Sequence, residues 1–227
     1  MVCQTVCSAS MLLALGWFLI AGTGSDHTEE NHQCLFTAKN YTELANSLKL
    51  ITEQIDQITG CHELEQRTEI YALLQNTADK MRAIRIRACH KVSPKNCSIP
   101  LVPNNGGLMC LTLNKTRYCK PMCNQEADFN FLRKSRLFES CGESTQYQWT
   151  TQYVGGSRLA QCSVTRMNLH VSGDATAYFR STCHQALLDY ENSKMMMNNF
   201  KKELQAKGIV GKIKNRTECL MCGNISV

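Results

Sequence analysis

Apolar residues recur at helical spacing in the N-terminal third of the chain. Between residues 41 and 59 they follow one another at intervals of four, three, four and three positions, which places them on one stripe of an α-helix. The members of this stripe are Leu44, Leu48, Ile51, Ile55 and Ile58. Thr42 can cap the start of the helix and Gly60 can end it.

A second, looser stripe predicts another helix over residues 62–88. Its members are Leu64, Tyr71, Leu74, Ala78, Met81 and Ile84. We expect the two helices to form an antiparallel hairpin, with Cys61 near the turn and with Cys34 and Cys89 bracketing the pair. An interface or an oligomerising coiled coil is the alternative. Each stripe is shorter than the three to four heptads typical of a coiled coil, so ordinary packing within the chain is favoured.

The pattern changes after residue 92, where Pro and Gly separate short apolar or aromatic runs. Such runs predict short strands, at 108–113, 129–132, 147–149 and 158–163. Helical spacing returns later and predicts one long helix over 184–207, with strands at 175–179 and 209–213. The sequence therefore predicts an α+β fold. Its parts are a helical hairpin region (25–91), a small β module (92–163) and a C-terminal region with one long helix and a Cys-rich tail (164–227).

The N-terminus carries an apolar run from Met11 to Gly22, followed by small residues. About a dozen apolar residues form the core of a secretory signal peptide and are too few to cross a bilayer. We expect cleavage near Gly24, so that residues 1–24 are the signal peptide. No other stretch approaches the roughly 20 apolar residues of a membrane-spanning helix. The product is therefore expected to be secreted and extracellular, without a membrane span.

Cysteine content supports this location. Of 14 cysteines, Cys3 and Cys7 lie in the signal peptide, which leaves 14 − 2 = 12. An even number behind a signal peptide predicts a disulfide framework, and such bonds persist in oxidising compartments.

Five Asn-x-Ser/Thr sequons predict N-glycosylation. Asn40, Asn114 and Asn215 are the stronger candidates. Asn96 is weaker because Cys97 lies inside its sequon, and Asn224 is weaker because it lies so near the end of the given chain.

The middle segment resembles a sushi (complement control protein) repeat of the six-cysteine, selectin-like type. A Pro-rich start from Cys97 to Cys110 is followed by the Cys119-Lys-Pro-Met-Cys123 pair, and then by further framework residues in the family's order. These are Cys141, Trp149 and Cys162. Where the family usually has Gly-Tyr or Gly-Phe after the second framework cysteine, this chain offers only Phe129.

The positions of six cysteines alone leave fifteen pairings open. The resemblance implies one of them, with the disulfide bonds Cys97–Cys141, Cys110–Cys119 and Cys123–Cys162. It also implies that Trp149 is a buried structural aromatic residue. Six cysteines keep unassigned partners: Cys34, Cys61, Cys89, Cys183, Cys219 and Cys222.

Catalytic and metal-binding patterns are not found in the sequence. No nucleophile-elbow motif occurs, and the six histidines lack metal-ligand spacing. Cys219-Leu-Met-Cys222 looks like a redox motif, but a redox-active pair needs its first thiol at a helix N-terminus. We therefore expect this pair to anchor the C-terminal tail. The chain is predicted to be no enzyme and to need no cofactor or metal.

The net charge of +6 is mild and does not indicate a nucleic-acid partner. Four cations near the end of the second helix, Lys80, Arg82, Arg85 and Arg87, complement the helix dipole and offer a possible contact for an anionic glycan. The favoured function is a secreted non-enzymatic glycoprotein that binds an extracellular protein or glycan through the sushi-like module and its flanking helices. The alternative is a soluble signalling ligand or antagonist acting on a cell-surface receptor.

Overall fold

A computed structural model describes residues 38–58, 64–131, 137–151, 155–165, 174–211 and 217–225. The predicted signal peptide, Cys34, Cys61 and Asn215 lie outside these ranges. Contacts divide the chain into two units, Met1–His62 and Glu63–Val227. The mixed helix and sheet content and the disulfide-rich character agree with the predicted α+β fold.

The first unit contains helix α1 (Ala38–Ile58), at the position that the apolar stripe predicts. The described stripe residues are not deeply buried, since Leu44 is 52% exposed and Leu48 is 42% exposed. The antiparallel hairpin remains a prediction.

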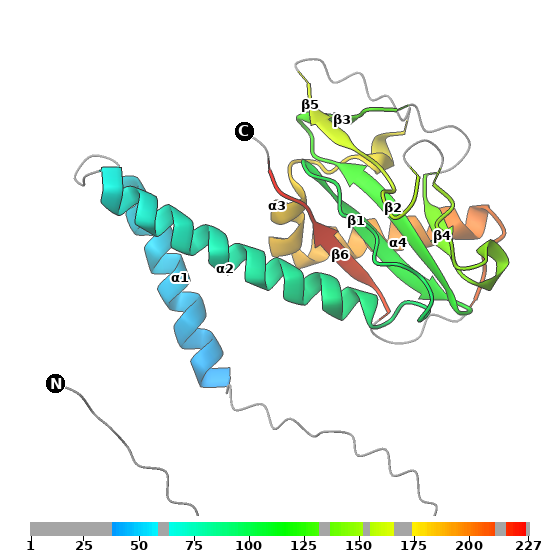
Figure 1. Cartoon of the computed structure of the whole chain (residues 1–227), viewed down its shortest axis with the longest axis horizontal. Coiled ribbons are helices and arrows are strands. Elements are labelled where there is room, and N and C mark those ends of the chain that lie inside the picture. The colour runs from blue at the N-terminus through cyan, green and yellow to red at the C-terminus, as the bar shows by residue number, and fades with distance from the viewer. Residues whose placement is uncertain are drawn as a thin grey trace, which may run out of the picture. The chain divides into compact units, whose positions relative to one another are not determined.

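Helix α2 (Leu64–His90) opens the second unit. Its 27 residues make it about 40 Å long. Arg87 and His90 lie in its last turn, where positive charge favours the helix dipole. The C-terminal part of α2 packs beside strand β6 (Cys219–Cys222), whereas its N-terminal part extends past the sheet (Figure 1).

A four-stranded antiparallel sheet forms the centre of this unit. Its strands lie in the order β4 (Glu139–Cys141), β2 (Thr116–Cys123), β1 (Gly106–Leu113) and β6. A two-residue turn joins β1 to β2. Its residues Asn114 and Lys115 have φ of 46° and 62°, as a type I′ hairpin turn requires.

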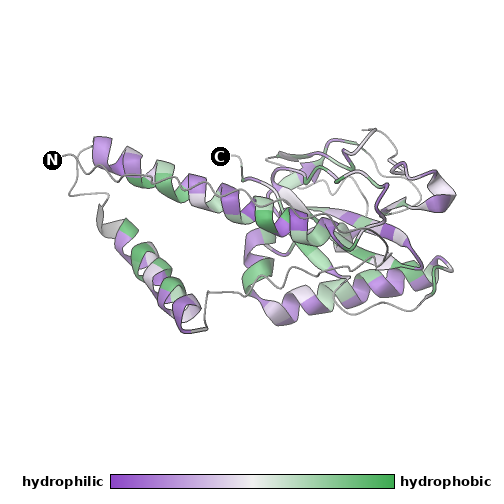
Figure 2. Cartoon of the chain, turned by 60° about the horizontal axis from the view of Figure 1, so that its bottom comes forward, coloured by the Kyte–Doolittle hydropathy of each residue, from purple (hydrophilic) through white to green (hydrophobic). Residues whose placement is uncertain are grey.

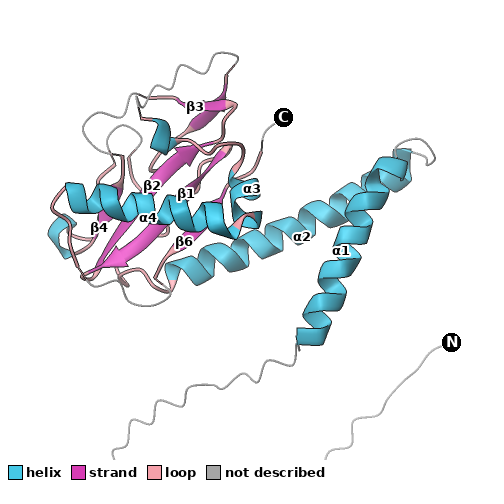
Figure 3. Cartoon of the chain, turned by 180° about the vertical axis from the view of Figure 1, so that it is seen from behind, coloured by secondary structure: helices cyan, strands magenta, loops and turns pink. Residues whose placement is uncertain are grey.

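Both faces of the sheet are covered, and β1 shows why its sequence reads as a nearly continuous apolar run. Met109, Leu111 and Leu113 contribute to a core with Phe200 and Leu204 of helix α4 (Tyr190–Ala206). Figure 3 shows α4 crossing this face. Leu108 and Cys110 belong to a second cluster, which is rich in disulfides and includes Trp149. Alternate residues of one strand therefore serve two cores.

A smaller two-stranded sheet joins β3 (Ala127–Phe129) to β5 (Cys162–Val164). Phe129 is buried, and its ring meets that of Tyr178 edge to face at a centroid distance of 5.6 Å. Short 3₁₀ turns lie at Glu143–Thr145 and Ala175–Ala177.

Several predicted elements differ from the structure. The predicted strand at 175–179 is mainly a 3₁₀ turn, because the Asp174 carboxylate accepts a hydrogen bond from the N–H of Thr176 and caps it. Residues 147–149, predicted as a strand, form none, because Gln146 and Tyr147 have positive φ in a turn. The single helix over 184–207 is two helices, α3 (Cys183–Leu188) and α4, since Asp189 ends the first and caps the second.

The strand bounds differ as well. β3 ends at Phe129, and β5 begins at Cys162. The described residues 209–211 form no strand, and the rest of that predicted strand lies outside the described ranges. The middle and C-terminal segments also share one sheet, because β6 pairs with β1.

Candidate functional site

Three disulfide bonds hold the middle segment together. They join Cys97 to Cys141, Cys110 to Cys119 and Cys123 to Cys162, with Cα–Cα distances of 6.0, 4.1 and 5.6 Å. These are the same three pairs that the sushi resemblance implies. Trp149 is buried in the cluster that contains the first two bridges, and its indole N–H donates to the carbonyl oxygen of Ser98 at 3.0 Å.

Two further bridges attach the C-terminal tail to helices. Cys219 pairs with Cys89 at the end of α2, and Cys222 pairs with Cys183 at the start of α3. The Cys-x-x-Cys segment is therefore no internal dithiol in this structure, since its two cysteines have different partners. The partners of Cys34 and Cys61 remain unassigned because both lie outside the described residues.

Arg117 is buried beside the bridge that Cys89 and Cys219 form. Its Nη2 lies 3.0 Å from Cys89 Sγ and 2.9 Å from Cys219 Sγ. Its Nη1 donates to the carbonyl oxygen of Thr217 at 2.6 Å and to Thr112 Oγ1 at 3.0 Å. Burial lowers the pKa of Arg117 from 12.5 to about 10. Sequence reasoning missed this residue, because nothing in the local pattern marks an arginine on β2 as buried.

A groove runs between α2, α3 and β6, with a volume of about 580 Å³. We call it the apolar groove. Most of its lining is aliphatic or methionine, from Met81, Ile84 and Ile86 of α2, Leu187 of α3 and Met221 of β6. Figure 2 shows hydrophobic residues on the part of α2 next to the sheet. The volume is typical of a site that accepts a ligand or part of a partner.

Three polar side chains line the apolar groove, namely Arg82, Arg85 and His184. Arg82 forms an ion pair with Asp79. Arg85 donates from Nε to the carbonyl oxygen of Leu220 at 2.7 Å, and burial lowers its pKa. Burial and then the charge of Arg82 lower the pKa of His184, so its imidazole is mostly neutral at pH 7.

The four cations predicted as a glycan contact do not share one environment. Arg82 and Arg85 line the apolar groove, whereas Lys80 and Arg87 are exposed and do not line it. Arg87 donates from Nε to the carbonyl oxygen of Ala83, within its own helix.

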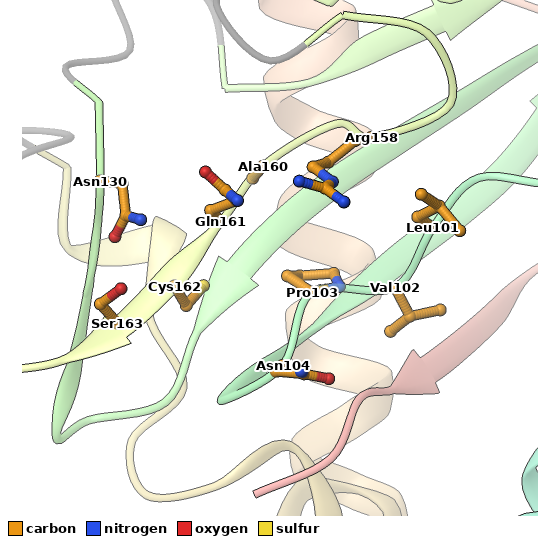
Figure 4. Close-up of a pocket in the computed structure, with 10 residues that line it drawn as sticks. All are labelled: Leu101, Val102, Pro103, Asn104, Asn130, Arg158, Ala160, Gln161, Cys162 and Ser163. Carbon is orange, nitrogen blue, oxygen red and sulfur yellow. The ribbon is translucent and has the colours of Figure 1, made fainter. Parts of the chain in front are cut away.

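A second, more polar pocket of about 340 Å³ lies on the middle segment (Figure 4). The segment from Leu101 to Asn104 forms one side of it, and residues around β5 form the other. Its polar members are Asn104, Asn130, Arg158, Gln161 and Ser163. These groups can hydrogen-bond to a polar ligand.

A catalytic arrangement does not emerge from the described residues. They contain no cluster of three His, Cys, Asp or Glu side chains that could hold a metal ion. The buried carboxylate of Asp128 accepts a hydrogen bond from the Tyr178 hydroxyl. That contact places Tyr178 against β3, a structural role.

Four of the five sequon asparagines lie in the described ranges, and all four are exposed: Asn40, Asn96, Asn114 and Asn224. Within the part of the chain that the structure describes, no helix combines the length and apolar character of a membrane span.

Comparison with protein-family models, with curated proteins and with solved structures finds no match.

Proposed function

We propose that the chain is a secreted, non-enzymatic glycoprotein that binds an extracellular partner, with the apolar groove as its main contact surface. The observation that carries this proposal is the groove itself. It is open to solvent, it is lined mostly by apolar side chains, and Arg82 and Arg85 lie along it. Apolar surface rimmed by charge is typical of binding sites, since burying it upon association is favourable.

A protein partner fits this surface better than a glycan does. Met81, which lines the groove, is 62% exposed, and the exposed apolar residues of α2 continue beyond the groove with Leu73 at 59% and Tyr71 at 68% exposure. Methionine side chains such as Met81 and Met221 adapt to the shape of a partner. A glycan would bring mainly hydroxyl groups, which apolar side chains cannot satisfy.

The polar pocket of Figure 4 supports glycan binding as the second candidate. Arg158 and the amides of Asn104, Asn130 and Gln161 offer donors and acceptors to hydroxyl or sulfate groups. This pocket belongs to the sushi-like module, so the two candidates use different surfaces of the chain.

Proximity labelling around the tagged full-length chain in its tissue of origin tests the proposal. We expect one or a few cell-surface or matrix proteins to be labelled. Ile84→Glu should abolish that labelling, because it places a charge in the apolar groove. Leu188→Glu is the matched control, since Leu188 is 89% exposed and does not line the groove.

Binding measurements with purified proteins then distinguish a signalling ligand or antagonist from a glycan-binding protein. Nanomolar binding to a single receptor that Ile84→Glu abolishes would support the signalling ligand or antagonist. Weak binding to heparin that salt removes, and that Ile84→Glu leaves unchanged, would favour the glycan. Equal loss of labelling with Ile84→Glu and Leu188→Glu would contradict a role for the groove.

A further inference from the structure

Among the described disulfide bonds, the bridge between Cys89 and Cys219 is the one for which a contact with a buried arginine is found. It joins the last turn of α2 to the first residue of β6, across 130 positions of sequence. Cys89 is only 4% exposed, whereas Cys219 is partly exposed. An external thiolate can therefore approach Cys219 more readily than Cys89.

Arg117 places a positive charge against this bridge. The residue is only 1% exposed, and its Nη2 lies within 3.0 Å of both sulfur atoms. Its other acceptors are neutral: the carbonyl oxygens of Cys89 and Thr217 and the hydroxyl of Thr112. Among the described residues, no carboxylate pairs with Arg117.

A disulfide bond is neutral, so within the described ranges Arg117 has no counter-charge while this bridge is intact. A buried cation without a counter-charge is costly. Reduction would create a thiolate within hydrogen-bond distance of the guanidinium, and a nearby cation stabilises a thiolate. The surroundings therefore favour the reduced form of this bridge.

The neighbouring bridge, Cys183–Cys222, provides the contrast. Both of its cysteines are buried, at 0% and 4% exposure. Cys183 Sγ lies 3.7 Å from the carbonyl oxygen of Met221, whose partial negative charge would repel rather than stabilise a thiolate. The two bridges that the Cys-x-x-Cys segment makes thus lie in different electrostatic environments.

We propose that the Cys89–Cys219 bridge is a thiol–disulfide exchange site, opened by an extracellular thiol or by a dithiol oxidoreductase. The attacking thiolate forms a bond to Cys219 Sγ. The bond to Cys89 Sγ breaks, and its electron pair leaves with Cys89 as a thiolate beside Arg117.

With a monothiol, the product is a mixed disulfide at Cys219. With a dithiol, the second thiolate displaces Cys219, so that both cysteines are reduced and the dithiol becomes a disulfide. Two electrons pass from the dithiol to the bridge. The end of α2 and β6 are then no longer covalently joined.

Graded exposure of the full-length secreted protein to reduced glutathione tests this site. After acid quenching and alkylation, mass spectrometry measures the modification of each cysteine. Cys219 should be modified at about one tenth of the glutathione concentration that modifies Cys222. A tenfold difference corresponds to stabilisation of the thiolate by about one pKa unit. Cys222 is thus an internal control for overall unfolding, and the Arg117 variants control for the greater exposure of Cys219.

Two variants test whether the positive charge of Arg117 causes the difference between the two cysteines. Arg117→Met should reduce the difference between Cys219 and Cys222 to what their unequal exposure gives, whereas Arg117→Lys should retain most of it. Lys80→Met controls for the loss of one positive charge on the surface. Modification of Cys222 before Cys219, or together with it, in the wild-type protein would overturn the proposal. This comparison of Cys219 with Cys222 in the wild-type protein tests the proposed exchange site even where Arg117→Met is not secreted.

Discussion

The Lys120 ammonium on β2 lies 2.7 Å from a carboxylate oxygen of Glu203 on α4. The pair joins the helix layer to the sheet, and the Lys120 side chain is only 3% exposed. The same ammonium also donates to Thr176 Oγ1 at 2.9 Å. A cation in the middle of the sheet is thus accommodated by groups from two other segments.

Removal of the Glu203 charge should destabilise the fold strongly. Glu203→Gln removes the carboxylate that contacts Lys120 directly, although the charge of Asp174 still acts on the ammonium. We expect it to lower the free energy of unfolding by about 1.5–3 kcal/mol. Denaturant unfolding followed by fluorescence measures this. Trp149 is the reporter, as the sole tryptophan outside the predicted signal peptide.

The matched control for that variant is Glu218→Gln. Glu218 pairs with Lys201 at the same distance of 2.7 Å, but both side chains are more exposed, at 31% and 26%. Loss of this ion pair should lower the free energy of unfolding by less than about 1 kcal/mol. Equal costs for the two variants would show that burial of Lys120 does not govern the pair.

Trp149 should be the most sensitive aromatic position of the disulfide-rich cluster. Trp149→Phe removes the hydrogen bond to Ser98 and should cost about 1 kcal/mol. Trp149→Ala also leaves a cavity and should cost about 3–5 kcal/mol. Thermal unfolding followed by circular dichroism measures both. Leu188→Ala, at an exposed site, should change little, and a similarly small effect of Trp149→Ala would argue against a core role.

His184 should titrate below the usual histidine range. Arg82→Gln should raise its pKa toward 6.5, because it removes the charge that opposes protonation, whereas burial would still hold the pKa low. NMR titration of the imidazole protons measures the shift. Lys80→Gln is the control, since Lys80 does not line the apolar groove. An unchanged pKa in Arg82→Gln would contradict the coupling.

The lowered pKa of His184 also predicts how the stability of the fold depends on pH. The folded-state pKa of His184 is depressed, so the unfolded chain binds more protons once the pH approaches 6.5 from above. The contribution of His184 to stability is therefore present above about pH 6.5 and lost as the pH falls. His184→Gln should remove that part of the pH dependence.

Lys115→Gly should stabilise the β1–β2 hairpin. Lys115 has a φ of 62°, in the left-handed region that favours glycine. Asn-Gly is the preferred pair for a type I′ turn, so we expect a gain of about 0.5–1 kcal/mol in the free energy of unfolding. The variant keeps the sequon of Asn114, so glycosylation there should not change. Destabilisation would indicate that the Lys115 side chain has a role of its own.

The sequence predicted those elements whose pattern is local. The stripes of α1 and α2 have helical spacing, and β1 is an apolar run, so each was found close to its observed bounds. Strand β2 was not predicted, because Arg117, Lys120 and Pro121 make it look like a polar loop. The partners that permit burial of the two cations are Glu203, Thr217 and the sulfur atoms of a bridge, all distant in sequence.

The apolar groove could be predicted only in part. The stripe on α2 includes Met81 and Ile84, which form one wall of the groove. The opposite wall comes from Leu187 and Met221. Nothing local brings these residues to α2, since the tail bridges of Cys219 and Cys222 fix that arrangement.

Strand β6 has a consequence for biosynthesis. It is an edge of the central sheet and contributes Met221 and Cys222 to the apolar groove, yet it comes from residues 219–222. A ribosome must therefore release the chain as far as residue 222 before this edge can form. Until then β1 has an unpaired edge and Cys89 and Cys183 are free thiols, so the nascent chain is exposed to wrong strand pairing and wrong disulfide pairing.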